Sequence, residues 1–90
     1  MVKEGTLTAD GNTDEVFSSG RYTIHLSGTF GGGVFQLQFM DTQGAWRNYD
    51  PSLYGYSQNA DQTILEVQNV TVRGVLSGSS SPSLFWRFGV

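Results

Sequence analysis

Hydrophobic and polar residues alternate along much of the chain. In residues 21–27, 34–39 and 83–88, every second side chain is apolar. A period of two places these side chains on one face of a β-strand, so each segment is predicted to be a strand with one face in a core. The predicted inward-facing residues are Tyr22, Ile24, Leu26, Phe35, Leu37, Phe39, Leu84, Trp86 and Phe88.

Residues 63–76 also have the composition of a strand, because they are rich in β-branched and aliphatic side chains. Their alternation is broken, since Val67 and Val70 do not share a parity. A bulge or bend near Asn69 or Gly74 would reconcile the two halves. No window has a helical period long enough to predict a helix. Shorter strands are predicted at residues 4–9, 15–18, 45–49 and 53–57.

Seven to eight short strands separated by turn sequences predict an all-β fold. We expect a single small β-sandwich or jelly-roll-like domain of antiparallel strands that spans residues 1–90, since a chain of this length forms one domain. Residues 1–5 are a candidate extended N-terminal arm, which would pair with a neighbouring molecule as an added strand.

One short sequence occurs twice. Leu-Ser-Gly at residues 26–28 recurs at residues 76–78, and each copy follows a β-branched strand. Each copy also precedes a loop of small residues and then an aromatic strand. We interpret the two copies as one hairpin used twice, by internal duplication or by convergence on the same turn chemistry.

The amino-acid composition excludes several classes of function. Charged residues make up only 14% of the chain, and the formal net charge is −3. This balance offers no basic patch for nucleic acid or for an anionic membrane. The chain contains no cysteine, which excludes disulfides and thiolate zinc sites. Because so few residues are charged, the surface must consist mainly of hydroxyl, amide and glycine groups. Such groups exchange hydrogen bonds with water for hydrogen bonds with a partner more easily than ions do, which favours a subunit of an assembly.

The sequence SGTFGGGVFQLQ at residues 27–38, followed by DTQGAW at residues 41–46, resembles a pattern found in small tailed-phage virion proteins. A late LSG and SPS in residues 76–83 belong to the same pattern. The turn at residues 41–45 departs from it, because it lacks the usual double glycine before the tryptophan. The resemblance implies a capsid decoration or cement protein on the outer surface of the virion. Its implied partners are the major capsid protein and further copies of itself, as a trimer between capsomers.

His25 is the single histidine, and it lies on the polar parity of its strand. A catalytic base needs an orienting partner and a nucleophile, and no serine here occupies a Gly-x-Ser-x-Gly elbow. We interpret His25 as a surface or interface residue. The protein is therefore predicted to have no catalytic residues and not to be an enzyme.

Two segments are similar to ligand-binding loops but lack key residues. Residues 10–15 alternate oxygen ligands as a calcium loop does, yet Glu15 and Arg21 occupy the positions that need a glycine and a bidentate glutamate. The glycine-rich residues 28–33 precede a strand, whereas a phosphate loop precedes a helix. We predict a β-turn in the first segment and positive φ angles in the second, and we expect no cofactor and no metal.

Aromatic residues cluster between residues 46 and 56 and are interleaved with polar ones. Such rings suit three roles: a cap on the core, a protein interface, or a stacking surface for carbohydrate. Phe30, in the glycine-rich loop, would either cover the end of the core or point outward. The candidate interface residues are Phe30, Trp46, Arg47, Tyr49, Tyr54 and Tyr56.

The leading hypothesis from the sequence is a non-enzymatic capsid decoration protein. It would stabilise contacts between capsomers, because many weak contacts add up on a symmetric lattice. The alternatives are a carbohydrate-binding or adhesion module and a tail, neck or fibre component of the virion.

Overall fold

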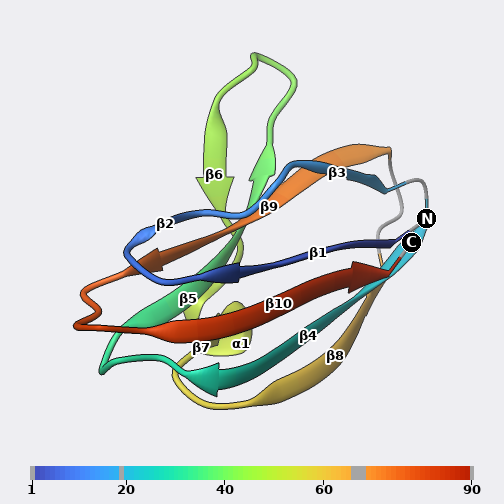
Figure 1. Cartoon of the computed structure of the whole chain (residues 1–90). Coiled ribbons are helices and arrows are strands. Elements are labelled where there is room, and N and C mark those ends of the chain that lie inside the picture. The colour runs from blue at the N-terminus through green and yellow to red at the C-terminus, as the bar shows by residue number, and fades with distance from the viewer. Residues whose placement is uncertain (1, 19, 66–68, 90) are drawn as a thin grey trace.

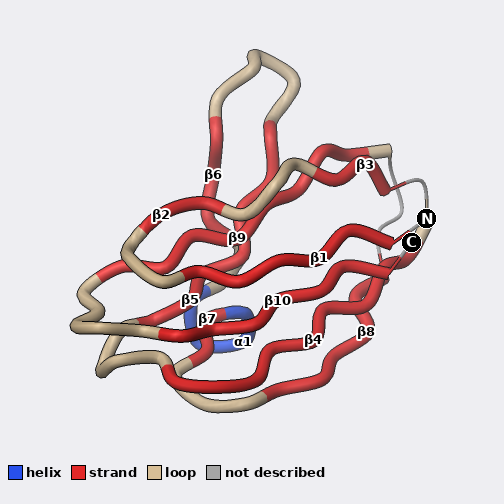
Figure 2. Tube along the Cα trace, viewed as in Figure 1, coloured by secondary structure: helices blue, strands red, loops and turns tan. Residues whose placement is uncertain are grey.

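Two antiparallel sheets stack on each other in the computed structural model, which describes residues 2–18, 20–65 and 69–89 (Figures 1 and 2). Sheet A contains, in spatial order, β1 (Val2–Leu7), β10 (Ser83–Gly89), β4 (Arg21–Thr29) and β8 (Ala60–Leu65). Sheet B contains β2 (Gly11–Asn12), β9 (Val70–Ser77), β5 (Val34–Met40) and β6 (Trp46–Asn48), with β3 (Val16–Ser18) paired to β9 and β7 (Gly55–Tyr56) paired to β5. The short helix α1 comprises Pro51–Tyr54. The prediction of an all-β fold is confirmed.

The two sheets share one core between them. Side chains of β4 and β10 enter it from sheet A, and side chains of β5 and β9 enter it from sheet B. The alternation read from the sequence is therefore correct in all three long segments. Phe39 is partly buried and packs against this core. The fully buried side chains include Tyr22, Ile24, Leu26, Phe35, Leu37, Val72, Leu76, Leu84 and Phe88.

Both copies of the Leu-Ser-Gly sequence carry the chain from one sheet to the other, so the prediction of two hairpins is wrong. β4 lies in sheet A and leads to β5 in sheet B, whereas β9 lies in sheet B and leads to β10 in sheet A. The strands on either side of one copy pair with those on either side of the other. β4 pairs with β10, where Leu26 is opposite Trp86, and β5 pairs with β9, where Phe35 is opposite Leu76. The repeated sequence thus builds two interlocked arches.

The glycine-rich loop fits closely against the second arch. Gly28 and Gly31 have φ angles of 117° and 64°, which confirms the predicted positive φ. The backbone N–H of Ser80 donates to the carbonyl of Gly31 at 2.9 Å. A Cβ atom at Gly31 would lie 2.4 Å from the carbonyl oxygen of Ser80, so the two loops can approach only because a glycine stands there.

Residues 63–76 form parts of two strands in different sheets. β8 belongs to sheet A and β9 to sheet B, and Val67 lies outside the described residues. The apolar parity differs between β8 and β9 because the two strands lie in different sheets, so a bulge at Gly74 is wrong. The alternative of a bend near Asn69 borders residues 66–68, which lie outside the described residues. Pairing of β9 with β5 is continuous through Gly74. Gly74 instead makes room for the ring of Phe35, whose Cζ would lie 1.8 Å from a Cβ at that position.

A bulge does occur in the strand that lines the other side of β9. Between the pairs Asn12–Val75 and Val16–Val72, three residues of the outer strand oppose two of β9. Thr13 occupies this bulge and is buried. Its backbone N–H donates to the carbonyl of Gly74 at 2.9 Å, and its Oγ1 accepts from the N–H of Gly74 at 2.9 Å. The threonine hydroxyl thus replaces a missing backbone acceptor.

Two further predictions are corrected at the ends of elements. The proposed arm at residues 1–5 is part of the sheet from Val2 onward, because β1 pairs along its length with β10; Met1 lies outside the described residues. The strand predicted at residues 53–57 begins as α1. Asp50 caps this helix by accepting from the N–H of Ser52 at 3.0 Å, and Pro51 starts its first turn.

Candidate binding surfaces

A row of ionisable side chains crosses all four strands of sheet A. Glu4 on β1 is opposite Arg87 on β10, Arg87 is opposite His25 on β4, and His25 is opposite Asp61 on β8. All four side chains lie on the outer face, since the alternate residues of these strands fill the core. His25 donates through Nδ1 to Oδ1 of Asp61, and its side chain is 41% exposed. His25 is thus a surface residue of the chain.

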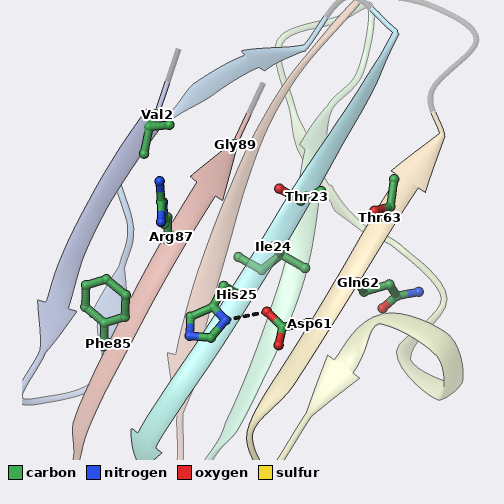
Figure 3. Close-up of a pocket in the computed structure, with 10 residues that line it drawn as sticks. All are labelled: Val2, Thr23, Ile24, His25, Asp61, Gln62, Thr63, Phe85, Arg87 and Gly89. Atoms are coloured by element: carbon green, nitrogen blue, oxygen red, sulfur yellow. Dashed lines mark hydrogen bonds and ion pairs between the residues drawn. The ribbon is translucent and has the colours of Figure 1, made fainter.

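Beside this row the outer face of sheet A is hollowed (Figure 3). The open depression has a volume of about 480 Å³. Gly89 lies at its edge between Val2 and Thr23, which are its partners on the two neighbouring strands. The absence of a side chain at Gly89 leaves the space, because a Cβ there would lie 2.8 Å from Oγ1 of Thr23. The ring of Phe85 lies 6.0 Å from that of His25, at 64° to it.

The outer face of sheet B carries a different kind of surface, which we call the Trp46 patch: Trp46, Arg73, Gln38 and Asn48. The guanidinium carbon of Arg73 lies 4.1 Å from the ring centroid of Trp46. Arg73 Nε donates to Oε1 of Gln38 at 2.9 Å, and Nε2 of Gln38 donates to Oδ1 of Asn48 at 2.8 Å. One arginine, one indole ring and two amides are therefore held in a fixed arrangement on this face.

Apolar side chains extend the Trp46 patch. Met40 is opposite Trp46 on the same face of the β5–β6 pair. Phe17 is opposite Thr71 on the far side of β9 and is 55% exposed, and Val34 is 45% exposed at the start of β5. Together they give sheet B an outer face with large, partly exposed apolar groups between amides.

The end of β5, the following turn and β6 project from the body of the sandwich (Figure 1). Asp41 organises this turn by accepting from the backbone N–H groups of Gln43 and Ala45, each at 2.9 Å. Arg47 Nε donates to Oδ2 of Asp41 at 2.6 Å. These hydrogen bonds, that of Arg47 foremost, lower the pKa of Asp41 to about 2. The candidate residue Arg47 thus holds the turn from an exposed position.

Three of the candidate aromatic residues pack against the core. Tyr49 lies 4.8 Å from Phe39 and 5.3 Å from Tyr54 by ring centroids, with interplanar angles of 53° and 59°. The hydroxyl of Tyr56 donates to Oε1 of Gln62. Burial, followed by the neighbouring Tyr54, raises the pKa of Tyr56 to about 12. All three rings pack against the core, and Tyr49 and Tyr54 are tilted to each other, so these two do not form a flat stacking surface for carbohydrate.

Phe30 is only 6% exposed and belongs to the core. It therefore covers the end of the core, the first of the two roles predicted for it, and does not present its ring as an interface residue. The β-turn predicted at residues 10–15 is wrong, because Gly11–Asn12 form strand β2 and residues 13–15 form the bulge against β9. Asp10 instead holds the neighbouring loop. The carboxylate of Asp10 accepts from the N–H of Gly78 at 3.1 Å, from the N–H of Ser79 at 3.0 Å and from the Ser79 hydroxyl.

In residues 2–18, 20–65 and 69–89, no three His, Cys, Asp or Glu side chains gather closely enough to hold a metal ion. Within the same part of the chain, α1 has only four residues and does not reach the length of a membrane span.

The fold and its outer surfaces define an all-β, two-sheet protein with a filled interior. The chain matches no protein-family model and no curated protein. It is similar to a solved structure described as the solution NMR structure of a de novo designed double-stranded beta-helix. That likeness has a TM-score of 0.51 and 15% sequence identity, and covers 99% of this chain and 96% of the designed one. At this identity the likeness concerns the fold alone.

Sequence reasoning missed the partners of the candidate residues. The pairing of His25 with Asp61 and of Trp46 with Arg73 depends on strand register, which the alternation of residues does not specify. Glu4 and Arg87 each lie on the polar parity of a strand, which is the only local signal they carry.

Proposed function

We propose that this chain is a non-enzymatic structural protein of a virion, a decoration protein that attaches to the outer surface of a phage capsid. The family resemblance, which covers about residues 20–46 and 72–88, supports a place in the virion. The low charge of the chain, with 14% charged residues, supports a subunit that buries much of its surface. Its partners would be the major capsid protein and further copies of itself, with a trimer as the expected oligomer.

The Trp46 patch is the observation that carries the proposal. Tryptophan and arginine are enriched among the residues that contribute most to protein interfaces. Here Arg73 is held over Trp46 by its hydrogen bond to Gln38, so little side-chain freedom is lost on binding. The exposed Phe17 adds apolar area on the same face of sheet B. We propose that this face contacts the capsid.

Co-sedimentation with empty capsids tests the proposal. Purified protein is mixed with capsids assembled from the major capsid protein alone, and the bound fraction is measured for the wild type, Arg73→Ala and Trp46→Ala. Both variants should bind at least tenfold more weakly, as expected for central interface residues. Val2→Ser changes an exposed apolar residue on the opposite sheet and should bind as the wild type does.

A wild-type protein that does not sediment with capsids would contradict the decoration role. If the protein instead co-purifies with tail, neck or fibre proteins, it is a virion component, but one located in the tail, neck or fibre and not on the capsid. Sedimentation equilibrium of the free protein measures the oligomer, with a trimer expected.

A further inference from the structure

The row Glu4–Arg87–His25–Asp61 stands out because the chain has few charges. Within the described residues, Arg87 forms neither an ion pair nor a hydrogen bond, although Glu4 and His25 flank it in the sheet. In Figure 3 the Arg87 side chain lies toward Val2 and Gly89, beside the depression. The guanidinium of Arg87 beside this depression can therefore bind an anionic group. Its planar arrangement of N–H donors matches the two oxygens of a carboxylate or phosphate.

The groups beside Arg87 restrict the kind of anion. His25 uses Nδ1 for Asp61, which leaves Nε2 for a ligand. The Asp61 side chain is 79% exposed and has an oxygen that accepts hydrogen bonds only. A ligand with negative charge alone would be repelled by Asp61 and by Glu4. A ligand with hydroxyl groups alone would leave Arg87 without its anion.

We propose that this depression binds a sugar acid, a saccharide unit that carries a carboxylate beside its hydroxyl groups. The carboxylate pairs with Arg87, and the sugar hydroxyls donate to Asp61 and exchange hydrogen bonds with Thr23 and Thr63, which line the depression. The ring of Phe85 offers an apolar contact to the C–H face of the sugar. The volume of about 480 Å³ lies in the range of small-ligand sites.

This site lies on the face opposite to the Trp46 patch, and it is distinct from the aromatic cluster that the sequence suggested for carbohydrate. A capsid-bound subunit that uses sheet B would leave the depression open to solvent. The proposal does not depend on the virion role, since sugar binding is measured on the free protein.

The test compares three probes of the same length on the whole protein: a uronic-acid tetrasaccharide, a neutral tetrasaccharide and tetraglutamate. Calorimetry gives the affinities, and amide chemical shifts locate the site. We expect the uronic-acid probe to bind at least tenfold more tightly than either of the others, and to shift the amides of Thr23, Thr63 and Gly89. Equal binding of tetraglutamate, tighter binding of the neutral sugar, or no binding of any probe would overturn the proposal.

Arg87→Gln removes the guanidinium that pairs with the carboxylate of the ligand. It should lower the affinity for the uronic-acid probe about tenfold or more, the loss expected for a charged hydrogen bond. Arg21→Gln is the matched control, because Arg21 is an exposed arginine of neighbouring β4 that does not line the depression. Thermal unfolding of both variants checks that the fold is retained. Equal affinities of the two variants would refute the role of Arg87, and with it the sugar-acid site.

Discussion

Gly74 is the position at which a single added methyl group should disturb the core most clearly. Its Cβ would lie 1.8, 2.5 and 2.6 Å from three atoms of the Phe35 ring, whereas carbon atoms in contact are separated by about 3.5–4.0 Å. The ring must therefore retreat by more than an ångström, although Phe35 is fully buried. Replacing Gly74 by alanine is expected to destabilise the protein through this clash.

The magnitude follows from two opposing effects. Overpacking of a close-packed core costs about 1–3 kcal/mol, and expulsion of the ring would approach the roughly 3–5 kcal/mol of a Phe→Ala change. Alanine in a strand gains about 0.5–1 kcal/mol over glycine through lower backbone entropy in the unfolded chain. Gly74 is not among the glycines with positive φ, so the backbone adds no strain. A contact of 1.8 Å requires displacement of the ring, so the larger cost applies and, less the entropic gain, we expect a net loss of about 2–4 kcal/mol for Gly74→Ala.

Urea unfolding monitored by tryptophan fluorescence measures this loss, since Trp86 is buried in the core. Gly11→Ala is the control, because a Cβ at Gly11 meets nothing within 4 Å, and its stability should stay within about 0.5 kcal/mol of the wild type. Phe35→Leu removes the clashing ring atoms. The double variant Phe35→Leu/Gly74→Ala should therefore be more stable than the sum of the single changes by at least about 1 kcal/mol. Additive losses, or a Gly74→Ala variant as stable as the control, would refute the clash.

Three further predictions concern hydrogen bonds. Thr13→Val keeps the shape of the side chain but removes the acceptor of the buried Gly74 N–H, which should cost about 1–3 kcal/mol in urea unfolding and speed exchange of that amide proton; slow exchange would contradict it. Ser18 is fully buried and its Oγ has no hydrogen-bond partner among the described residues, so Ser18→Ala should raise the unfolding free energy, and a lower value would disprove this view. The pKa of Asp41 is about 2 in the folded protein and about 3.9 in an unfolded chain, so the bond from Arg47 stabilises the fold above about pH 4, and this contribution is lost as the pH falls through 2. The stability difference between the wild type and Asp41→Asn should shrink over that range, and a constant difference would show that the carboxylate is not responsible.

The sequence predicted the strands whose inner residues alternate with polar ones, because burial of one face imposes a period of two. Tyr22, Ile24 and Leu26 are examples, since each enters the core as expected. The path between strands was not predictable in the same way. The alternation of apolar residues is interrupted in the same way by a bulge within one strand and by a passage of the chain from one sheet to the other. The sequence of β8 and β9 therefore predicts one segment, although they are two strands in different sheets.

Turn sequences had a similar ambiguity. A Leu-Ser-Gly sequence before a loop of small residues suits a hairpin and an arch equally well, because both need residues with positive φ, such as Gly28 and Gly78. The choice is made by partners far along the chain: β4 pairs with β10 and β5 with β9. Long-range pairing of this kind leaves no mark in a window of a few residues.

The two outer faces differ in the chemistry they offer, and this difference separates their expected roles. On sheet B, Arg73 of the Trp46 patch already stacks on an indole ring and donates to an amide, so a protein partner meets a guanidinium that is oriented and has two of its contacts in place. On sheet A, Arg87 and Asp61 remain exposed on either side of His25. A partner that covered them without supplying both a negative charge and hydrogen-bond donors would leave Arg87, and the Asp61 oxygen that His25 does not contact, without partners. A broad protein contact is therefore favoured on sheet B and selective recognition of a small polar ligand on sheet A. Arg87→Gln combined with Asp61→Asn removes the two charges on either side of His25. That double variant should lose the uronic-acid probe and keep its binding to capsids, and loss of capsid binding would contradict this division of roles.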